Sequence, residues 1–193
     1  MKKSLLLGTL LGGIIAFFWS WVSWDVLPWH ESNLLAFQNE DMVAHAITAN
    51  TTQSGIYLFP GGPAPGLSKE QKKAAAATQM AKMGQGTIIF AAVRRSEGFS
   101  FASGLIKQIS SQLLAAFLMT WLLLQTRGLS FWGRVGFLTV AGLTASVICD
   151  LPNWNWWGFS TRYTIVQLAD NALTWYLAGL AIAKVANPSA ARQ

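Results

Sequence analysis

Four long apolar runs limit what this chain can fold into. They cover approximately residues 4–24, 103–124, 131–149 and 163–185. At about 1.5 Å of rise per residue, a helix of about twenty residues matches the roughly 30 Å hydrocarbon core of a membrane. The runs are continuously apolar rather than alternating, and backbone groups in lipid must be bonded within the segment, so we predict four transmembrane helices.

The composition is not that of an ordinary soluble protein. Charged residues make up 11% of the 193 residues and apolar residues 52%, whereas a soluble domain has about 25% charged residues. The net charge of +6 comes from segments beside the apolar runs that contain no acidic residue and carry Lys2, Lys3, Arg127, Arg134, Lys184 and Arg192. The other basic residues, 14 less these six, equal the 8 acidic ones in number, so no basic stripe is left to bind nucleic acid.

The same basic residues predict the orientation in the membrane. Short loops rich in Lys and Arg stay in the cytoplasm, whereas long loops are translocated regardless of charge. We therefore expect a multi-pass protein of the bacterial inner (cytoplasmic) membrane with both termini and residues 125–130 in the cytoplasm. Residues 25–102 and the loop 150–162 then face outward.

The predicted fold class is an integral membrane protein, mainly α-helical, with a small α/β extracytoplasmic domain between the first and second membrane helices. Residues 1–24 form the first helix, an uncleaved signal anchor, because Trp21 stands where a cleavage site needs a small residue. Residues 25–102 form the outer domain, and residues 103–193 contain the other three helices.

Within the outer domain the sequence predicts the order helix, strand, helix, strand. The predicted elements cover about residues 37–49, 54–60, 69–83 and 87–93. Asn39 and Ser68 are suitable caps for the two helices, and the strands are β-rich and bounded by Gly or Pro. Because a two-stranded sheet is marginal by itself, we expect the membrane, the Trp-rich loop or a partner to support this domain.

Two rows of small residues predict close helix packing. Gly8 and Gly12 form a GxxxG pattern in the first helix, and Ala141, Ala145 and Cys149 form a row in the third. Small residues let helices approach closely in lipid. We expect both rows to pack helices within one chain rather than to form a dimer interface.

Three polar residues fall at similar depth inside the predicted helices. They are Gln112, Asp170 and Asn171. An ionisable group in a membrane helix is costly and usually faces the interior. Asp170 therefore either holds helices together by bonding to Gln112, to nearby hydroxyls or to Lys107, or it belongs to a transport pathway.

Aromatic residues cluster at the predicted outer interface. The loop 150–162 contains Trp154, Asn155, Trp156 and Trp157, and Trp29 follows the first helix at the same boundary. Indole rings favour that boundary because they are apolar with one polar N–H. These residues either anchor the chain at the interface or form a platform for a partner protein or a lipid.

A metal site is the weakest of the candidate sites. Asp41 and His45 are four residues apart and share a helix face, and His30 is a possible third ligand. No HExxH or paired-cysteine pattern accompanies them, and the alternative is a His30 that caps the turn after Pro28 beside a solvated Asp41–His45 pair. Catalytic motifs for nucleophiles, phosphates and dinucleotides are absent from the sequence, and we predict no cofactor.

Several segments resemble a family of uncharacterised bacterial four-helix inner-membrane proteins. They are LPWH at 27–30, SGIYLFP at 54–60, RVGF at 134–137 and LPNWNWWGFS at 151–160. The resemblance covers nearly the whole chain and implies a single bacterial membrane unit. The family has no assigned activity, cofactor or catalytic residue, so the resemblance transfers no site.

Three functions follow from these patterns. The first is a non-enzymatic accessory or scaffold subunit that binds a partner protein, a lipid or a second copy through its outer domain and Trp-rich loop. The second is a small oligomeric transporter or channel that uses Asp170. The third is a metal-dependent membrane enzyme that uses His30, Asp41 and His45.

Overall fold

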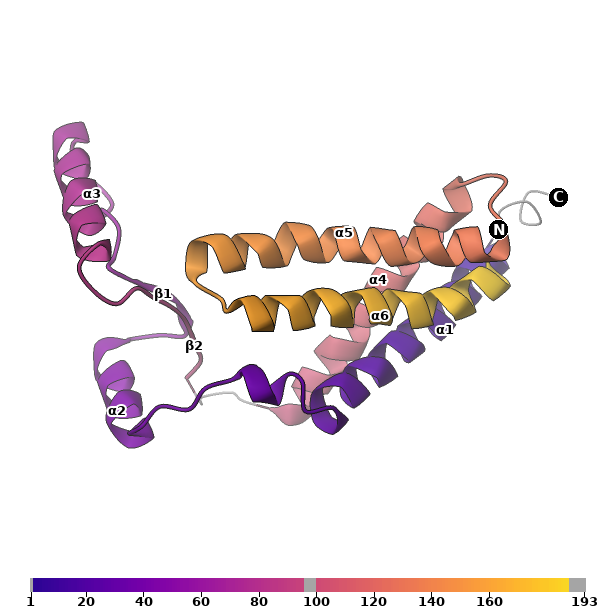
Figure 1. Ribbon diagram of the computed structural model, residues 1–193, viewed down its shortest axis with the longest axis horizontal. Helices are drawn as coiled ribbons and strands as arrows, with labels where there is room; N and C mark the ends of the chain where they lie inside the picture. The colour runs from indigo at the N-terminus through magenta and orange to yellow at the C-terminus, as the bar shows by residue number, and fades with distance from the viewer. Residues whose placement is uncertain (1, 96–99, 188–193) are drawn as a thin grey trace. The chain divides into compact units, whose positions relative to one another are not determined.

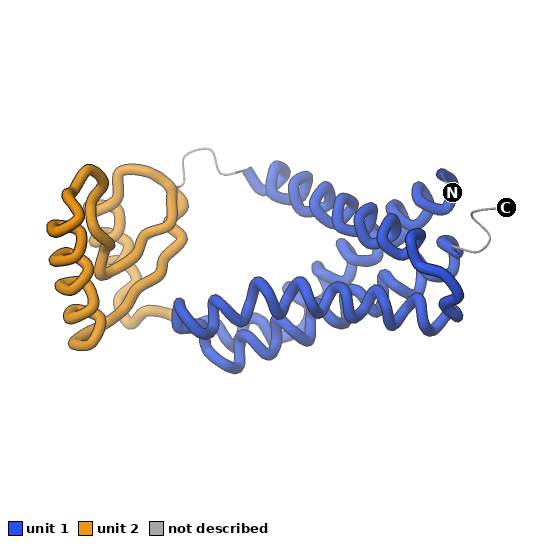
Figure 2. The backbone as a smooth tube through the Cα atoms, turned by 90° about the horizontal axis from the view of Figure 1, so that it is seen from above, with its two compact units in different colours: residues 1–35, 100–193 blue, residues 36–99 orange. Residues whose placement is uncertain are grey.

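The computed structural model describes residues 2–95 and 100–187 of the chain. It divides into two compact units (Figure 2). Residues 1–35 and 100–193 form one unit, called the helical unit below, and residues 36–99 form the other, called the α/β unit. Each is described by itself.

Four long helices make up the helical unit (Figure 1). They are α1 (Lys2–Trp21), α4 (Phe101–Gln125), α5 (Phe131–Trp157) and α6 (Thr161–Val185). A π-helical turn, η1 (Val22–Val26), extends α1. All four are long and apolar enough to cross a membrane, which agrees with the four predicted runs.

The main difference from the predicted helices is the end of α5. Residues 150–162 were expected to form a loop, but α5 continues to Trp157 with Pro152 inside it. Gly158 ends the helix at φ 73°, and the N–H groups of Gly158 and Phe159 both bond to the Asn153 carbonyl. Glycine adopts this left-handed conformation at helix ends because it has no Cβ. The connection to α6 is therefore only three residues long, Gly158 to Ser160.

In the helical unit, α1 packs against α4 and α6, and α5 packs against α6. A Cβ atom on Gly8 would lie 2.5 Å from Thr120 Cγ2, and one on Gly12 would lie 2.6 Å from Ile182 Cδ1. These glycines thus let α1 approach both neighbours closely. The expectation that the GxxxG pattern packs helices within the chain is confirmed.

Of the small-residue row predicted for α5, only Ala141 packs against the core of the unit. Ala145 and Cys149 are exposed, and the buried face of α5 instead contains Leu138, Gly142 and Ser146. A Cβ atom on Gly142 would lie 2.0 Å from Cδ1 of the Trp175 indole on α6. The absence of a side chain at Gly142 therefore lets Trp175 of α6 pack directly against the backbone of α5.

The core of the helical unit lies in the half that contains the start of α1. Its fully buried side chains include Leu123 on α4, Leu138 on α5 and Ile182 on α6. The buried residues of α4 all lie between Ala116 and Leu124, and the first half of this helix is mostly exposed. The opposite half of the unit therefore contains open space beside α1.

The α/β unit has the predicted order of elements. It contains α2 (Glu40–Asn50), β1 (Gly55–Phe59), α3 (Lys69–Met83) and β2 (Ile89–Val93). The strands pair antiparallel, with Gly55 opposite Val93 and Phe59 opposite Ile89. Both predicted caps are present, since Asn39 Oδ1 accepts from the Met42 N–H and Ser68 forms a capping box with Gln71.

The boundary of this unit differs from the predicted domain of residues 25–102. The α/β unit begins at residue 36, because the segment before it folds back onto α1. Among the residues described in its four elements, none is buried. Apolar side chains such as Met42, Ile56 and Met80 are exposed instead, so this unit has almost no apolar core.

Candidate functional site

Asp170 on α6 bonds to two side chains from the first thirty residues of the chain. The Trp19 indole donates from Nε1 to Asp170 Oδ1 at 2.7 Å, and His30 Nε2 lies 3.2 Å from Asp170 Oδ2. The His30 side chain is 1% exposed and the Asp170 side chain 13%. Each carboxylate oxygen therefore has a partner, as a mostly buried acid requires. We call these residues, together with Ser23, the Asp170 centre.

Local sequence explains how His30 reaches this position. Leu27 is extended, at φ −88° and ψ 136°, because a residue before proline disfavours the helical conformation. The helix therefore ends at the π-turn, where the Leu27 N–H bonds to the Val22 carbonyl at 3.0 Å. The chain then folds back, and His30 Nε2 lies 3.0 Å from Ser23 Oγ.

Two tryptophans fix the imidazole of His30. The Trp24 ring stacks on it, with ring centroids 4.0 Å apart and an angle of 4° between the planes. Trp29 packs edge-on against it and donates from Nε1 to both the carbonyl and the hydroxyl oxygen of Ser23, each at 3.0 Å. The imidazole is thus held by ring contacts as well as by hydrogen bonds.

Ser23, His30 and Asp170 are the residue types of a nucleophilic triad, but their geometry is different. A triad needs the serine and the acid on opposite ring nitrogens of the histidine. Here Ser23 Oγ and Asp170 Oδ2 both meet Nε2, and Nδ1 is buried without a hydrogen-bond partner among the described residues. Ser23 is itself fully buried. This arrangement orients Asp170 and does not activate a nucleophile.

The structure brings Gln112, Asp170 and Asn171 together in the lining of one pocket of about 240 Å³. We call this pocket the polar chamber. Its other lining residues are Ser20, Trp24, Gln108, Asp150, Gln167, Thr174 and Trp175. The described bonds of Asp170 go to Trp19 and His30 rather than to Gln112, and Lys107, the other expected partner, is exposed.

Asp150 is a second acid in this chamber that the sequence interpretation missed. It was assigned to an outer loop, but the extension of α5 places it within a helix, where its Oδ2 accepts from the Ser146 hydroxyl. At 1.5 Å per residue, Asp150 lies about 11 Å from the end of α5 and Asp170 about 14 Å from the start of α6. Gly158 is the signal that predicts the later helix end.

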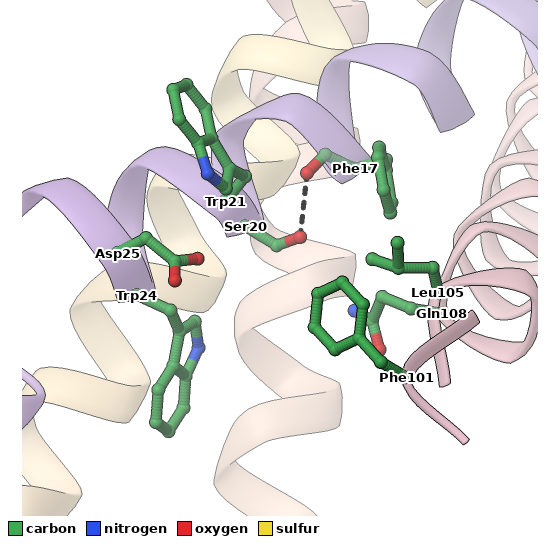
Figure 3. A pocket seen from close by; sticks show the side chains of 8 residues that line it. All are labelled: Phe17, Ser20, Trp21, Trp24, Asp25, Phe101, Leu105 and Gln108. Carbon is green, nitrogen blue, oxygen red and sulfur yellow. Dashed lines mark hydrogen bonds between the residues drawn. The ribbon is translucent and has the colours of Figure 1, made fainter. Parts of the chain in front are cut away.

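Figure 3 shows an apolar groove, three of whose lining residues also line the polar chamber. Side chains of α1 and the turn after it line one side, and side chains of α4 line the other. The lining residues are Phe17, Ser20, Trp21, Trp24, Asp25, Phe101, Leu105 and Gln108, around about 560 Å³. The groove and the chamber share Ser20, Trp24 and Gln108.

The three candidate metal ligands do not assemble into a site. Within residues 2–95 and 100–187, no three His, Cys, Asp or Glu side chains are grouped as a metal site requires. Asp41 and His45 are exposed on α2, and His30 contacts Ser23 and Asp170. His30 does precede the short 3₁₀ turn Glu31–Asn33, but its side chain makes no capping bond there, so the expected capping role is wrong.

The aromatic residues of the predicted outer interface have different environments. Trp29 is half-buried and donates to Ser23, so it supports the Asp170 centre. Trp154 donates to Thr161 Oγ1 across the α5–α6 connection at 3.1 Å. Asn155 is exposed, and Trp156 and Trp157 are 72% and 37% exposed. The last turn of α5 therefore presents an aromatic surface.

Comparison with protein-family models, with curated proteins and with solved structures found no match for this chain. Its function is therefore inferred from its own geometry. Two features carry that inference, namely the groove beside α1 and the polar chamber that adjoins it.

Proposed function

We propose that this chain is a non-enzymatic multi-pass protein of the bacterial inner membrane whose helical unit binds a membrane lipid beside α1. The observation that supports this is the joined pair of pockets. One is mainly apolar and the other mainly polar, and they share Ser20, Trp24 and Gln108. An amphipathic molecule has the same division between an apolar chain and a polar headgroup.

The chemistry of each pocket suits one part of such a molecule. Phe17, Phe101 and Leu105 give the groove an apolar wall, and its volume of about 560 Å³ is within the range of ligand pockets, roughly 300–1,000 Å³. The carboxylates and amides of the chamber would be costly against hydrocarbon alone. A headgroup would supply them with hydrogen-bond partners.

The proposed orientation places both termini in the cytoplasm. The start of α1, the α4–α5 connection and the end of α6 lie at the same end of the helical unit (Figure 1), and these segments carry the basic surplus of the sequence. In a Cys149→Ser background, we expect a membrane-impermeant maleimide to label Gly62→Cys in intact cells. Gln125→Cys should be labelled only after lysis, and the reverse pattern would refute this orientation.

Blocking the groove tests lipid binding. Leu105→Trp places a large ring in the groove, so the purified protein should retain less co-purified phospholipid than the wild type. Leu114→Trp is the matched control, because Leu114 lies on the same helix, is 60% exposed and does not line the groove. Equal lipid retention by the two variants, measured by native mass spectrometry, would contradict the proposal.

A partner protein is a second candidate ligand, because the α/β unit exposes apolar side chains that a solitary domain would bury. Examples are Met42, Ile56 and Met80, which are 65%, 64% and 70% exposed. In the helical unit, Trp156 at the end of α5 is a further exposed apolar side chain. Mild extraction at native expression level should then yield a stoichiometric partner or a homo-oligomer, and a monomer without any partner would count against this role.

The transporter alternative depends on Asp170. Both of its oxygens already have partners within the chain, which favours a positioning role over that of a transient carrier of an ion. Asp170→Asn should therefore lower the stability of the helical unit, because it weakens the contacts with Trp19 and His30, and should leave ion flux in liposomes unchanged. Loss of a measured flux in liposomes, with folding unchanged, would support transport instead.

A further inference from the structure

We infer that the polar chamber selects a lipid headgroup that carries an ammonium group. This inference rests on the proposed lipid-binding function and specifies its ligand class. The polar chamber lies between α1, α4, α5 and α6 and takes two acids, Asp150 and Asp170, from different helices. Neither the chamber nor the groove has a Lys or Arg in its lining.

The two acids differ in whether a basic side chain contacts the carboxylate. Asp170 is paired with His30 at 3.2 Å and accepts the Trp19 N–H. Asp150 accepts the Ser146 hydroxyl, and no basic group forms an ion pair with it in the part of the chain that the structure describes. Asp150 therefore gives the chamber an acid without a basic partner, which favours a cationic ligand.

The other lining groups can accept hydrogen bonds from an ammonium group. An ammonium has three N–H donors and no acceptor, and the chamber offers amide carbonyls from Gln112 and Asn171 and the hydroxyl of Thr174. Gln167 also lines the chamber, and because its N–H donates to Tyr163 Oη at 2.7 Å, its carbonyl oxygen is left as an acceptor. The Trp24 ring supplies a π-face of the kind that attracts cations.

Two observations favour an amphiphile over a bare inorganic cation. No cluster of three acidic or His ligands is present among the described residues, so a dehydrated ion would lack an adequate ligand set. The apolar groove also continues from the chamber through Ser20, Trp24 and Gln108, and it adds the carboxylate of Asp25. A bare cation would leave this groove unused, whereas the acyl chain of a lipid fills it.

Displacement of a chain-labelled fluorescent phosphatidylethanolamine from the purified full chain tests the inference. Unlabelled phosphatidylethanolamine should compete about tenfold better than phosphatidylglycerol with the same acyl chains, as a charge-assisted hydrogen bond implies. Asp150→Asn keeps the acceptor for Ser146 but removes the charge, so it should abolish this preference. Asp41→Asn, an exposed acid on α2, is the control and should retain it.

Each other outcome has a defined meaning. Equal competition by the two lipids would overturn the ammonium inference and leave lipid binding intact, whereas no saturable binding of either lipid would refute the proposed function itself. Displacement by potassium ions at concentrations that match the lipid would indicate an inorganic cation site and overturn the lipid class. If Asp150→Asn does not fold, Gln112→Lys provides the second variant, because a cation in the chamber should reverse the preference toward phosphatidylglycerol.

Discussion

At the level of single residues, Asp170 is not an isolated acid, because both of its carboxylate oxygens contact side chains from elsewhere in the helical unit. The indole of Trp19 and the imidazole of His30 approach its two oxygens from segments about 150 and 140 residues earlier in the chain. All ten tryptophans of the chain lie in the helical unit. Tryptophan fluorescence therefore reports the unfolding of this unit without a signal from the α/β unit.

Trp19→Phe should weaken the helical unit through the loss of one hydrogen bond. The indole N–H lies 2.7 Å from a carboxylate oxygen, and a bond of this kind within a membrane protein contributes about 1–2 kcal/mol. We expect the free energy of unfolding in detergent to fall by that amount. Trp21→Phe is the control, since Trp21 is 51% exposed and its indole nitrogen has no bond among the described residues. An equal effect of both substitutions would contradict a specific role for the Trp19 bond.

The two histidines provide a matched pair for a second prediction. His30→Ala removes a 1% exposed side chain, leaves Asp170 Oδ2 without its partner and opens a void beside Trp24. Breaking a mostly buried pair in this way should lower the free energy of unfolding by about 3 kcal/mol. His45→Ala, at an exposed position of α2, should cause no measurable change in the fluorescence-detected transition. A stable His30→Ala protein would show that the fold does not depend on the Asp170 centre.

At the scale of elements, the contact of α5 with α6 depends on the absence of a side chain at Gly142. A Cβ there would meet three atoms of Trp175 at 2.0, 2.3 and 2.7 Å. Because Trp175 is 6% exposed and packed in the core, it has little room to move. Gly142→Ala should therefore separate the helices and destabilise the unit by about 2–3 kcal/mol.

Gly136→Ala on the same helix is the control for that substitution. A Cβ at Gly136 would have no neighbour within 4 Å, and alanine is the better helix former by up to about 1 kcal/mol. We expect this variant to be neutral or slightly more stable in the same unfolding assay. A Gly142→Ala protein as stable as Gly136→Ala would show that α5 and α6 are not held at this distance.

At the scale of the whole molecule, the two units differ in how much apolar surface they bury. The helical unit has a contiguous core that includes Leu123, Leu138 and Ile182, whereas the described elements of the α/β unit contain no buried residue. Local stability follows buried contacts. We expect amides of β1 and β2 in the purified protein to exchange hydrogen much faster than those in the middle of α5 and α6.

The same exchange experiment in native membranes tests whether the α/β unit is covered by a partner. Protection of β1 and β2 that appears only in native membranes would support a bound partner or membrane contact. Strong protection in the purified monomer would contradict the expectation that this unit is marginal. Peptides from α2 give an independent readout in either case, because none of its residues is buried.

Much of the fold was determined by the sequence itself. The four apolar runs predicted the four long helices, because length and continuous apolarity are local properties. Asn39 and Ser68 predicted the starts of α2 and α3 for the same reason, since a cap acts within one turn. Gly8 and Gly12 were correctly assigned to packing within the chain.

The contacts among the polar groups depend on how the helices pack, which the sequence patterns did not predict. Residues 150–162 were expected to form a loop, yet α5 continues to Trp157 and places Asp150 in the polar chamber. Ala145 and Cys149 form a regular row of small residues, but helix rotation exposes them and buries Gly142 and Ser146. His30 was weighed as a metal ligand with Asp41 and His45, and the fold pairs it with Asp170 instead. Such pairings depend on the tilt and rotation of whole helices. Many weak contacts together determine that tilt and rotation, and no local sequence pattern encodes them.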